Sequence, residues 1–167
     1  RVAQPRPTRG GARAAGSGGT GSGARAYHHT APISMIYALH AGLGVLLDEG
    51  LEASWARHAE CGQLLKDGLD ARGWQLFAEK GHRLPELTTV WVPLDRLPSG
   101  MDEARVRRAL LDRYGIEVGG GLGEFAGKVW RIGLMGHTAR RRNVTTLLGA
   151  IDALVPANAK LFKLAEG

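Results

Sequence analysis

The sequence predicts an α/β fold of the α+β kind, with a small, mainly antiparallel sheet that carries helices on one face. Apolar residues recur every three or four positions in four segments, as in amphipathic helices. They recur at every second position in shorter segments, as in strands. The resulting order, helix-helix-strand-strand-helix-strand-strand-helix, suggests a small, mainly antiparallel sheet with the helices packed on one face.

Two consecutive helices open the folded part. Pro32 suits the first position of the first helix, and Gly50 ends that helix. The second helix is predicted over residues 51–72, and Gly73 closes it. Mostly apolar side chains follow one face of this second helix: Leu51, Trp55, His58, Cys61, Leu65 and Leu69.

The remaining elements are short. Four segments are predicted as strands: 74–77, 88–92, 116–118 and 128–135. A helix over 102–114 begins with two acidic residues, which suit its positive end, and is closed by Gly115. A glycine-rich loop occupies 119–123, and the last helix is predicted over 138–155, where Pro156 stops it.

The chain divides into four predicted parts. Residues 1–26 offer too little apolar surface to offset their ordering entropy, so we expect a disordered Gly/Ala/Arg-rich tail. A long helix occupies 27–50, a small domain occupies 51–156, and 157–167 form a C-terminal extension.

The net charge of +6 is concentrated in the tail. Residues 1–26 contain five arginines and no acidic residue, whereas residues 27–167 hold 17 basic and 16 acidic groups, a net +1. A near-neutral domain argues against a nucleic-acid partner, although the basic tail keeps that alternative open. No apolar run is long enough for a membrane span. The single cysteine excludes an intrachain disulfide, and we expect a cytoplasmic location.

The segment Tyr27-His28-His29-Thr30 directly precedes a helix start. Free backbone N–H groups and the positive end of the helix dipole bind phosphate or carboxylate at such places. Tyr27 and Thr30 add hydroxyl donors beside it. For such an anion site, Ile33 and Ser34 are expected to keep their backbone N–H donors available. The alternative is a plain capped helix with Thr30 near the cap.

Arg131 lies in an otherwise apolar strand, Trp130 to Gly136. A buried guanidinium without a partner is costly, so Arg131 must reach either solvent or an anion. Its planar fork matches a carboxylate through two hydrogen bonds. The alternative is an arginine on an edge strand that points to water.

Other motifs are weaker. The glycines at 119–123 lack the further glycine and the following helix of a nucleotide loop, so close backbone approach or positive φ explains them better. No metal-binding spacing is complete: adjacent His28 and His29 seldom converge on one ion, and His58 and Cys61 are more often core residues. We therefore predict no metal site.

Three segments together resemble one family. They are Tyr27–Ser34, Glu117–Gly123 and Trp130–Gly136, supported by Leu51–Arg57 between them. Their order and spacing are similar to the C-terminal portion of alanine–glyoxylate (serine–pyruvate) aminotransferases, which belong to class V of the fold-type I enzymes that use pyridoxal 5'-phosphate. The match covers residues 27 to about 155.

The resemblance implies a homodimeric enzyme that passes an amino group from an alanine- or serine-type amino acid to glyoxylate or a similar 2-oxo acid. Tyr27 and Thr30 would contact the cofactor phosphate in the neighbouring subunit, and Arg131 would hold the α-carboxylate of the substrate. The first helix would bridge the large and small domains. Members of the family also occur in peroxisomes and mitochondria.

One departure from the family concerns activity. The lysine that carries the cofactor lies upstream of the Tyr-His-His-Thr segment in the family, but the 26 residues before that segment contain no lysine here. We therefore predict no catalytic residue in this chain and no transaminase activity for the chain alone. Two alternatives stay open: a non-catalytic domain that acts through dimerisation, and a nucleic-acid-binding module that uses the basic tail.

Overall fold

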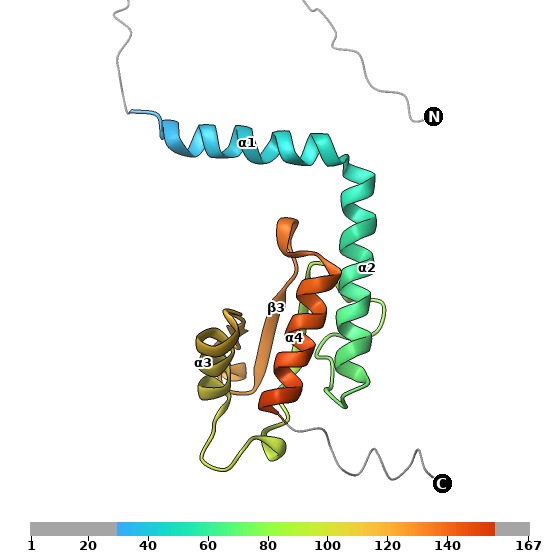
Figure 1. Ribbon diagram of the computed structural model, residues 1–167, viewed down its shortest axis with the longest axis vertical. Coiled ribbons are helices and arrows are strands. Elements are labelled where there is room, and N and C mark those ends of the chain that lie inside the picture. The colour runs from blue at the N-terminus through green and yellow to red at the C-terminus, as the bar shows by residue number, and fades with distance from the viewer. Residues whose placement is uncertain (1–29, 156–167) are drawn as a thin grey trace, which may run out of the picture.

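The computed structural model describes residues 30–155 of the 167-residue chain (Figure 1). The predicted tail over 1–26, the extension over 157–167 and Tyr27 all lie outside the described residues. The part that is described contains four α-helices and one three-stranded sheet. This is the α+β architecture that the sequence predicts.

Helix α1 spans Ile33–Glu49 and helix α2 spans Leu51–Asp70. Gly50 separates them with a φ of 85°, a backbone conformation that residues with a side chain rarely adopt. α1 therefore turns sharply away at the end of α2 and extends to one side of the remaining fold (Figure 1). Both predicted helices are confirmed, with ends that differ by one or two residues.

The sheet consists of β1 (Leu87–Trp91), β2 (Gly119–Gly120) and β3 (Val129–Gly133) in the order β1-β3-β2, with both pairings antiparallel. Strand β3 is therefore central. The register places Arg131 opposite Thr89 on one side and opposite Gly119 on the other.

Two predicted strands are wrong. Residues 74–77 form only an isolated bridge, between Leu76 and Val90, although Phe77 N–H donates to Thr89 O over 2.9 Å. Residues 116–118 stay outside the sheet, and the glycines at 119 and 120, predicted as loop, are the residues that pair with β3. A Cβ atom would lie 3.3 Å from Arg131 Nη2 at Gly119 and 3.1 Å from Arg107 Nη2 at Gly120, and the period of the apolar residues reveals neither close approach.

Helices α3 (Glu103–Tyr114) and α4 (Arg141–Leu154) complete the fold. The Asp102 side chain caps α3 by accepting from Arg105 N–H over 2.7 Å, and Gly115 ends it with a φ of 65°. Three short 3₁₀ turns lie at Leu94–Arg96, Gly123–Phe125 and Gly136–Thr138. The last of these turns occupies the start of the predicted final helix, so α4 begins three residues later than expected.

The core lies between the sheet and helices α2, α3 and α4. Trp74 and Trp130 are both buried at its centre, with ring centroids 5.2 Å apart. Cys61 is also buried there, as predicted for a small apolar residue. The core further includes Leu65, Leu69, Val90, Val106, Leu110, Ile132, Val144, Leu147 and Ile151.

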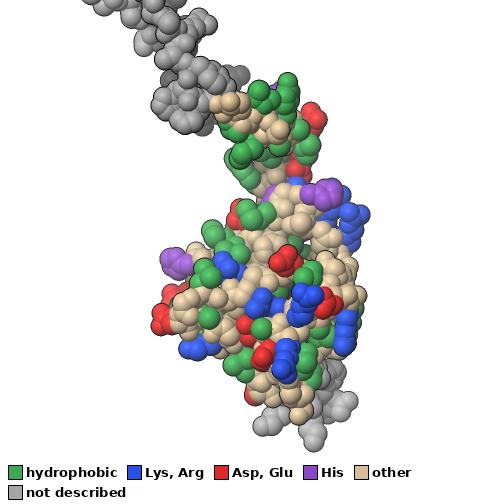
Figure 2. Space-filling model, turned by 90° about the vertical axis from the view of Figure 1, so that its left-hand side faces the viewer, with side chains coloured by type: hydrophobic (Ala, Val, Ile, Leu, Met, Phe, Trp, Pro, Cys, Tyr) green, Lys and Arg blue, Asp and Glu red, His purple; other side chains and the backbone are tan. Residues whose placement is uncertain are grey.

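Helix α1 takes no part in this core. None of its residues is buried, and Tyr37 is 72% exposed. Figure 2 shows hydrophobic side chains gathered over this helix. The exposure continues into α2, where Leu51 and Trp55 are exposed, so the predicted apolar face of α2 is buried only from Cys61 onward.

Candidate functional site

Arg131 lies on the face of the sheet that the helices leave uncovered. Its neighbours Trp130 and Ile132 point to the opposite face and are buried in the core, whereas Arg131 is exposed. Because β3 is the central strand, the alternative of an edge-strand arginine is wrong. Arg131 reaches the surface across the face of the sheet.

One hydrogen bond orients the Arg131 guanidinium. Its Nε donates to the carbonyl oxygen of Gly120 on the neighbouring strand over 2.8 Å. Within residues 30–155, no carboxylate forms an ion pair with Arg131. The charge on the two terminal nitrogens is therefore not neutralised by the described part of the chain, and this arrangement suits the binding of an external carboxylate.

The glycines beside Arg131 leave space for it. A Cβ atom on Gly119 would lie 3.3 Å from Arg131 Nη2, and one on Gly121 would lie 2.0 Å from the carbonyl oxygen of Phe125. Close approach thus explains Gly119 and Gly121, while positive φ occurs only at Gly123 (56°) among the glycines of this segment. The non-nucleotide interpretation of the glycine loop fits this geometry.

An aromatic cluster, which the sequence patterns did not reveal, stands on the same face. Phe77, Trp91 and Phe125 contact each other, with ring centroids 5.3 Å apart for Phe77–Trp91 and 5.0 Å apart for Phe77–Phe125. Trp91 pairs with Val129 in the register that pairs Thr89 with Arg131, so these side chains share one face. The three aromatic residues come from separate segments, and the bridge at Leu76, with the bond from Phe77 N–H to Thr89 O, brings Phe77 to the sheet.

The other predicted site begins at Thr30, which is exposed just before α1. The N-cap of this helix is Pro32, two residues after Thr30, and Pro32 provides no side-chain capping hydrogen bond. Ile33 N–H donates to Ala31 O over 2.8 Å and is already used, contrary to expectation. The first turn of α1 contains no acidic side chain, so the positive end of its dipole is not neutralised there.

The structure does not bring the two sites together. Thr30 precedes the end of α1 that extends away from the rest of the fold, while Arg131 lies within the sheet (Figure 1). Tyr27 and His28 lie outside the described residues.

A polar cluster fixes the direction in which α1 leaves the fold. Arg57 on α2 donates to both carboxylate oxygens of Glu49 at the end of α1, at 2.5 and 2.7 Å. Its remaining nitrogen donates to the carbonyl oxygens of Gly136 and Ala139, both at 2.8 Å. The Arg57 guanidinium also lowers the pKa of Glu49, chiefly through these hydrogen bonds.

His58 completes this cluster. Its Nε2 accepts from Gly136 N–H over 2.9 Å, and its Nδ1 lies 2.6 Å from Ser54 O. Both ring nitrogens are therefore occupied by backbone groups. Across the described range, 30–155, no group of three or more His, Cys, Asp or Glu side chains could hold a metal ion.

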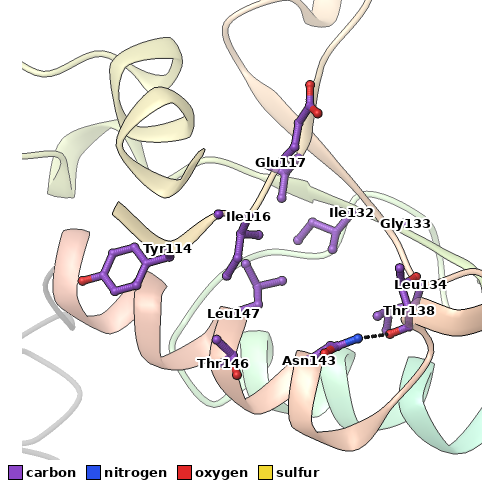
Figure 3. A pocket seen from close by; sticks show the side chains of 12 residues that line it. Tyr114, Ile116, Glu117, Ile132, Gly133, Leu134, Thr138, Asn143, Thr146 and Leu147 are labelled. Carbon is purple, nitrogen blue, oxygen red and sulfur yellow. Dashed lines mark hydrogen bonds between the residues drawn. The ribbon is translucent and has the colours of Figure 1, made fainter. Parts of the chain in front are cut away.

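A cavity of about 390 Å³ lies on the other side of the sheet, between the end of α3 and the start of α4. Ile116, Ile132 and Leu147 point into it, and Glu117 points away (Figure 3). Asn143 closes one end by donating to Thr138 O over 2.9 Å. Arg131 and Thr30 do not line this cavity, so it is separate from both predicted sites.

No helix in the described range combines the length and apolar character that crossing a membrane would require.

The fold and sequence match known aminotransferases. The chain is 38% identical over 131 residues to a (S)-ureidoglycine–glyoxylate transaminase of Bacillus subtilis. This matched region covers 78% of this chain and 30% of that protein. It is 43% identical over 128 residues to an alanine–glyoxylate aminotransferase of Callithrix jacchus, covering 76% and 30%. No family model matches the chain.

Solved structures of aminotransferases also resemble this chain in fold. An alanine–glyoxylate aminotransferase from Nostoc sp. superposes with a TM-score of 0.68 at 47% identity, over 80% of this chain and 34% of that one. The ureidoglycine–glyoxylate aminotransferase of B. subtilis gives a TM-score of 0.69 at 36% identity, covering 78% and 34%.

The chain is thus an aminotransferase homologue of class V, and within that class it belongs to the alanine–glyoxylate/ureidoglycine aminotransferase family as a partial, C-terminal portion. It spans about a third of the length of the relatives it matches.

Proposed function

We propose that this chain forms the substrate-holding, C-terminal part of a pyridoxal-phosphate aminotransferase. The reaction passes an amino group from an alanine- or serine-type amino acid to glyoxylate or a similar 2-oxo acid. The observation that carries the proposal is the exposed, unneutralised guanidinium of Arg131, held on the uncovered face of the sheet.

Arg131 holds the α-carboxylate of the substrate in this proposal. The central strand fixes its backbone, and the bond from Nε to Gly120 O fixes the plane of the fork. The two terminal nitrogens then remain for the carboxylate oxygens, a geometry that a lysine ammonium does not reproduce. The family resemblance and this geometry support the same role.

The cofactor phosphate would lie at the start of α1 of the neighbouring subunit. The donors there fit an anion in part: Thr30 is exposed, and no acidic residue lies in the first turn, but Ile33 N–H is already used. Tyr27 would supply a second hydroxyl group. Bound pyridoxal phosphate would act as the electron sink of the reaction, and the residues named here would bind and orient.

The chain on its own does not catalyse transamination in this proposal. Every lysine follows the Tyr-His-His-Thr segment: Lys66, Lys80, Lys128, Lys160 and Lys163. Lys66 is buried and donates to Gly62 O and Leu84 O, so it is not available to carry the cofactor. Sustained formation of pyruvate from alanine and glyoxylate by the purified chain with added cofactor would overturn this statement.

The role of Arg131 is tested by transplanting residues 30–155 into the Nostoc enzyme in place of its matched segment. In that chimera, Arg131→Lys should raise the KM for the amino acid by about 10–100-fold, as expected for losing a bidentate charged contact. Arg113→Lys, at an exposed position of α3, is the control and should leave KM unchanged. An active chimera whose KM ignores Arg131→Lys would contradict the role.

A second candidate function is a non-catalytic domain that acts through association. The observation behind it is α1, in which no residue is buried and Met35, Tyr37, Val45 and Leu47 are each more than two-thirds exposed. Surfaces of this kind mark contacts with other protein. Strong binding of the intact chain to a full-length relative, with no effect on turnover, would favour this candidate over the first.

A further inference from the structure

Glu103 is a buried carboxylate that the reaction, as proposed above, does not use. It is the first residue of α3 and is 6% exposed. A buried charge is costly unless it is paired and hydrogen-bonded. Glu103 meets that condition through two donors: Trp130 Nε1 at 3.0 Å, and Arg107, whose Nε lies at 2.7 Å and whose Nη2 lies at 3.3 Å.

Each of the two donors connects Glu103 to a strand next to or containing Arg131. Trp130 is the residue before Arg131 in β3, and its register partner is Gly120. The Arg107 guanidinium packs against Gly120 itself, because a Cβ atom there would lie 3.1 Å from Arg107 Nη2. Glu103 thus joins α3 to both residues of one rung of the β2–β3 ladder.

Gly120 is in turn the residue that orients Arg131, since its carbonyl oxygen accepts from Arg131 Nε over 2.8 Å. Strand β2 has only two residues, so few ladder hydrogen bonds hold it in place. The Arg107 guanidinium supports Gly120 from the helix side, and Glu103 fixes that guanidinium. The contacts therefore form a continuous path from Glu103 through Arg107 and Gly120 to Arg131.

We propose that Glu103 is a positioning residue for Arg131. It acts through Arg107 and Gly120, and it sets the direction in which the Arg131 fork faces a substrate carboxylate. This inference rests on the proposed function for its meaning, but the path of contacts can be tested without turnover.

The experiment measures the Arg131 Nε–H of the intact 167-residue chain by NMR. Protection of this proton from solvent exchange reports the bond to Gly120 O. Each variant is also titrated with glyoxylate, followed through the same signal, and its thermal unfolding is recorded. The variants are Glu103→Gln and Arg107→Lys. The second variant keeps the positive charge but loses the planar fork of the guanidinium.

The matched control is Asp112→Asn. Asp112 accepts from Arg108 over 2.8 Å and forms the other i,i+4 ion pair of α3, but both side chains are exposed and this bond joins them to each other rather than to β2 or β3. It removes an ion pair from the same helix without touching the path to Arg131.

Glu103→Gln should reduce the protection of Arg131 Nε–H and weaken glyoxylate binding by about tenfold each, the factor for one lost charge-assisted hydrogen bond. Arg107→Lys should reduce both in the same direction, and Asp112→Asn should change neither. A lower melting temperature with unchanged Arg131 protection would show that Glu103 only stabilises the fold, and would overturn the inference.

The outcomes separate the two proposals. A wild-type chain that does not bind glyoxylate would count against Arg131 as the carboxylate site, while the exchange data would still decide the positioning role. If Glu103→Gln does not fold, Arg107→Lys decides: unchanged Arg131 protection in that variant overturns the inference, and reduced protection supports it.

Discussion

Two apolar regions of this chain, the segment around β3 and helix α1, differ in how far their side chains are buried. The β3 region around Trp130 is packed on one side by α2, α3 and α4, and Trp130 is fully buried. Helix α1 is as rich in large apolar residues, yet none of them is buried. The difference shows that the sheet and helices α2, α3 and α4 bury apolar residues against one another, whereas the apolar residues of α1 are not buried by any part of residues 30–155.

The largest expected effect contrasts two tryptophans. Trp130→Ala removes a fully buried ring and the bond from its indole to Glu103, so the free energy of unfolding should fall by about 3–5 kcal/mol. Trp55→Ala, at a residue 64% exposed, should change it by less than about 0.5 kcal/mol. Urea unfolding of both variants measures the contrast, and equal losses would mean that Trp55 is as deeply buried as Trp130.

The next effect contrasts two glycines near Arg131. Gly121→Ala places a Cβ atom 2.0 Å from the backbone oxygen of Phe125, so the backbone between these two residues must shift and stability should fall by about 1–3 kcal/mol. Gly133→Ala meets nothing within 4 Å and should be neutral or slightly stabilising. Thermal unfolding tests the pair, and a neutral Gly121→Ala would contradict the close approach to Phe125.

A smaller effect concerns the pH dependence of the cluster that holds α1. Arg57 lowers the pKa of Glu49 below its ordinary value of 4.5, so the ion pair stabilises the folded arrangement above that value. This contribution should be lost as the pH falls through the lowered pKa, because Glu49 then takes up a proton.

Spin labels on α1 and α4 would report the change as a broader distance distribution in acid. Glu49→Gln should show the broad distribution at neutral pH as well, with little further change in acid. A distribution that narrows on acidification, or a pH response that survives in Glu49→Gln, would show that Arg57 does not fix α1 through Glu49.

The smallest effect on stability is expected on α1 itself. Ile36→Glu should leave the unfolding free energy within about 0.5 kcal/mol, because Ile36 is 53% exposed. It should nevertheless reduce self-association, measured as apparent mass by light scattering. Ala38→Glu, at a small exposed residue on the same helix, is the control. A chain that is monomeric before either substitution would remove the basis for α1 as a contact surface.

The sequence predicted the helices well because each has local signals. Gly50 and Gly115 mark helix ends with positive φ, and Asp102 caps α3, so these boundaries can be read without tertiary information. The strands were predicted less well. Residues 74–77 look like a strand but contribute a single bridge, and Gly119 and Gly120 form β2 although glycine disfavours strands.

Some residues of the candidate site could be predicted from the sequence and others could not. Arg131 was predicted from one charge within an apolar strand, and its exposure on the uncovered face of the sheet agrees with that argument. Glu103 and Arg107 could not be predicted, because an acidic residue at a helix start and a basic residue four positions later are ordinary on any surface helix. Their contacts with Trp130 and Gly120 arise only because α3 packs close to these residues in the folded structure.

The central place of β3 has a consequence for how this fold tolerates change. Arg131 is held by hydrogen-bonded neighbours on both sides, so its position does not depend on the lengths of the connecting segments. Insertions in the exposed loop around Lys80 to Leu84, or near Ser99, would alter the outline of the molecule while the guanidinium stays in place. Chains with this fold can therefore differ in the lengths and sequences of these loops and still hold an arginine at the same place in the sheet.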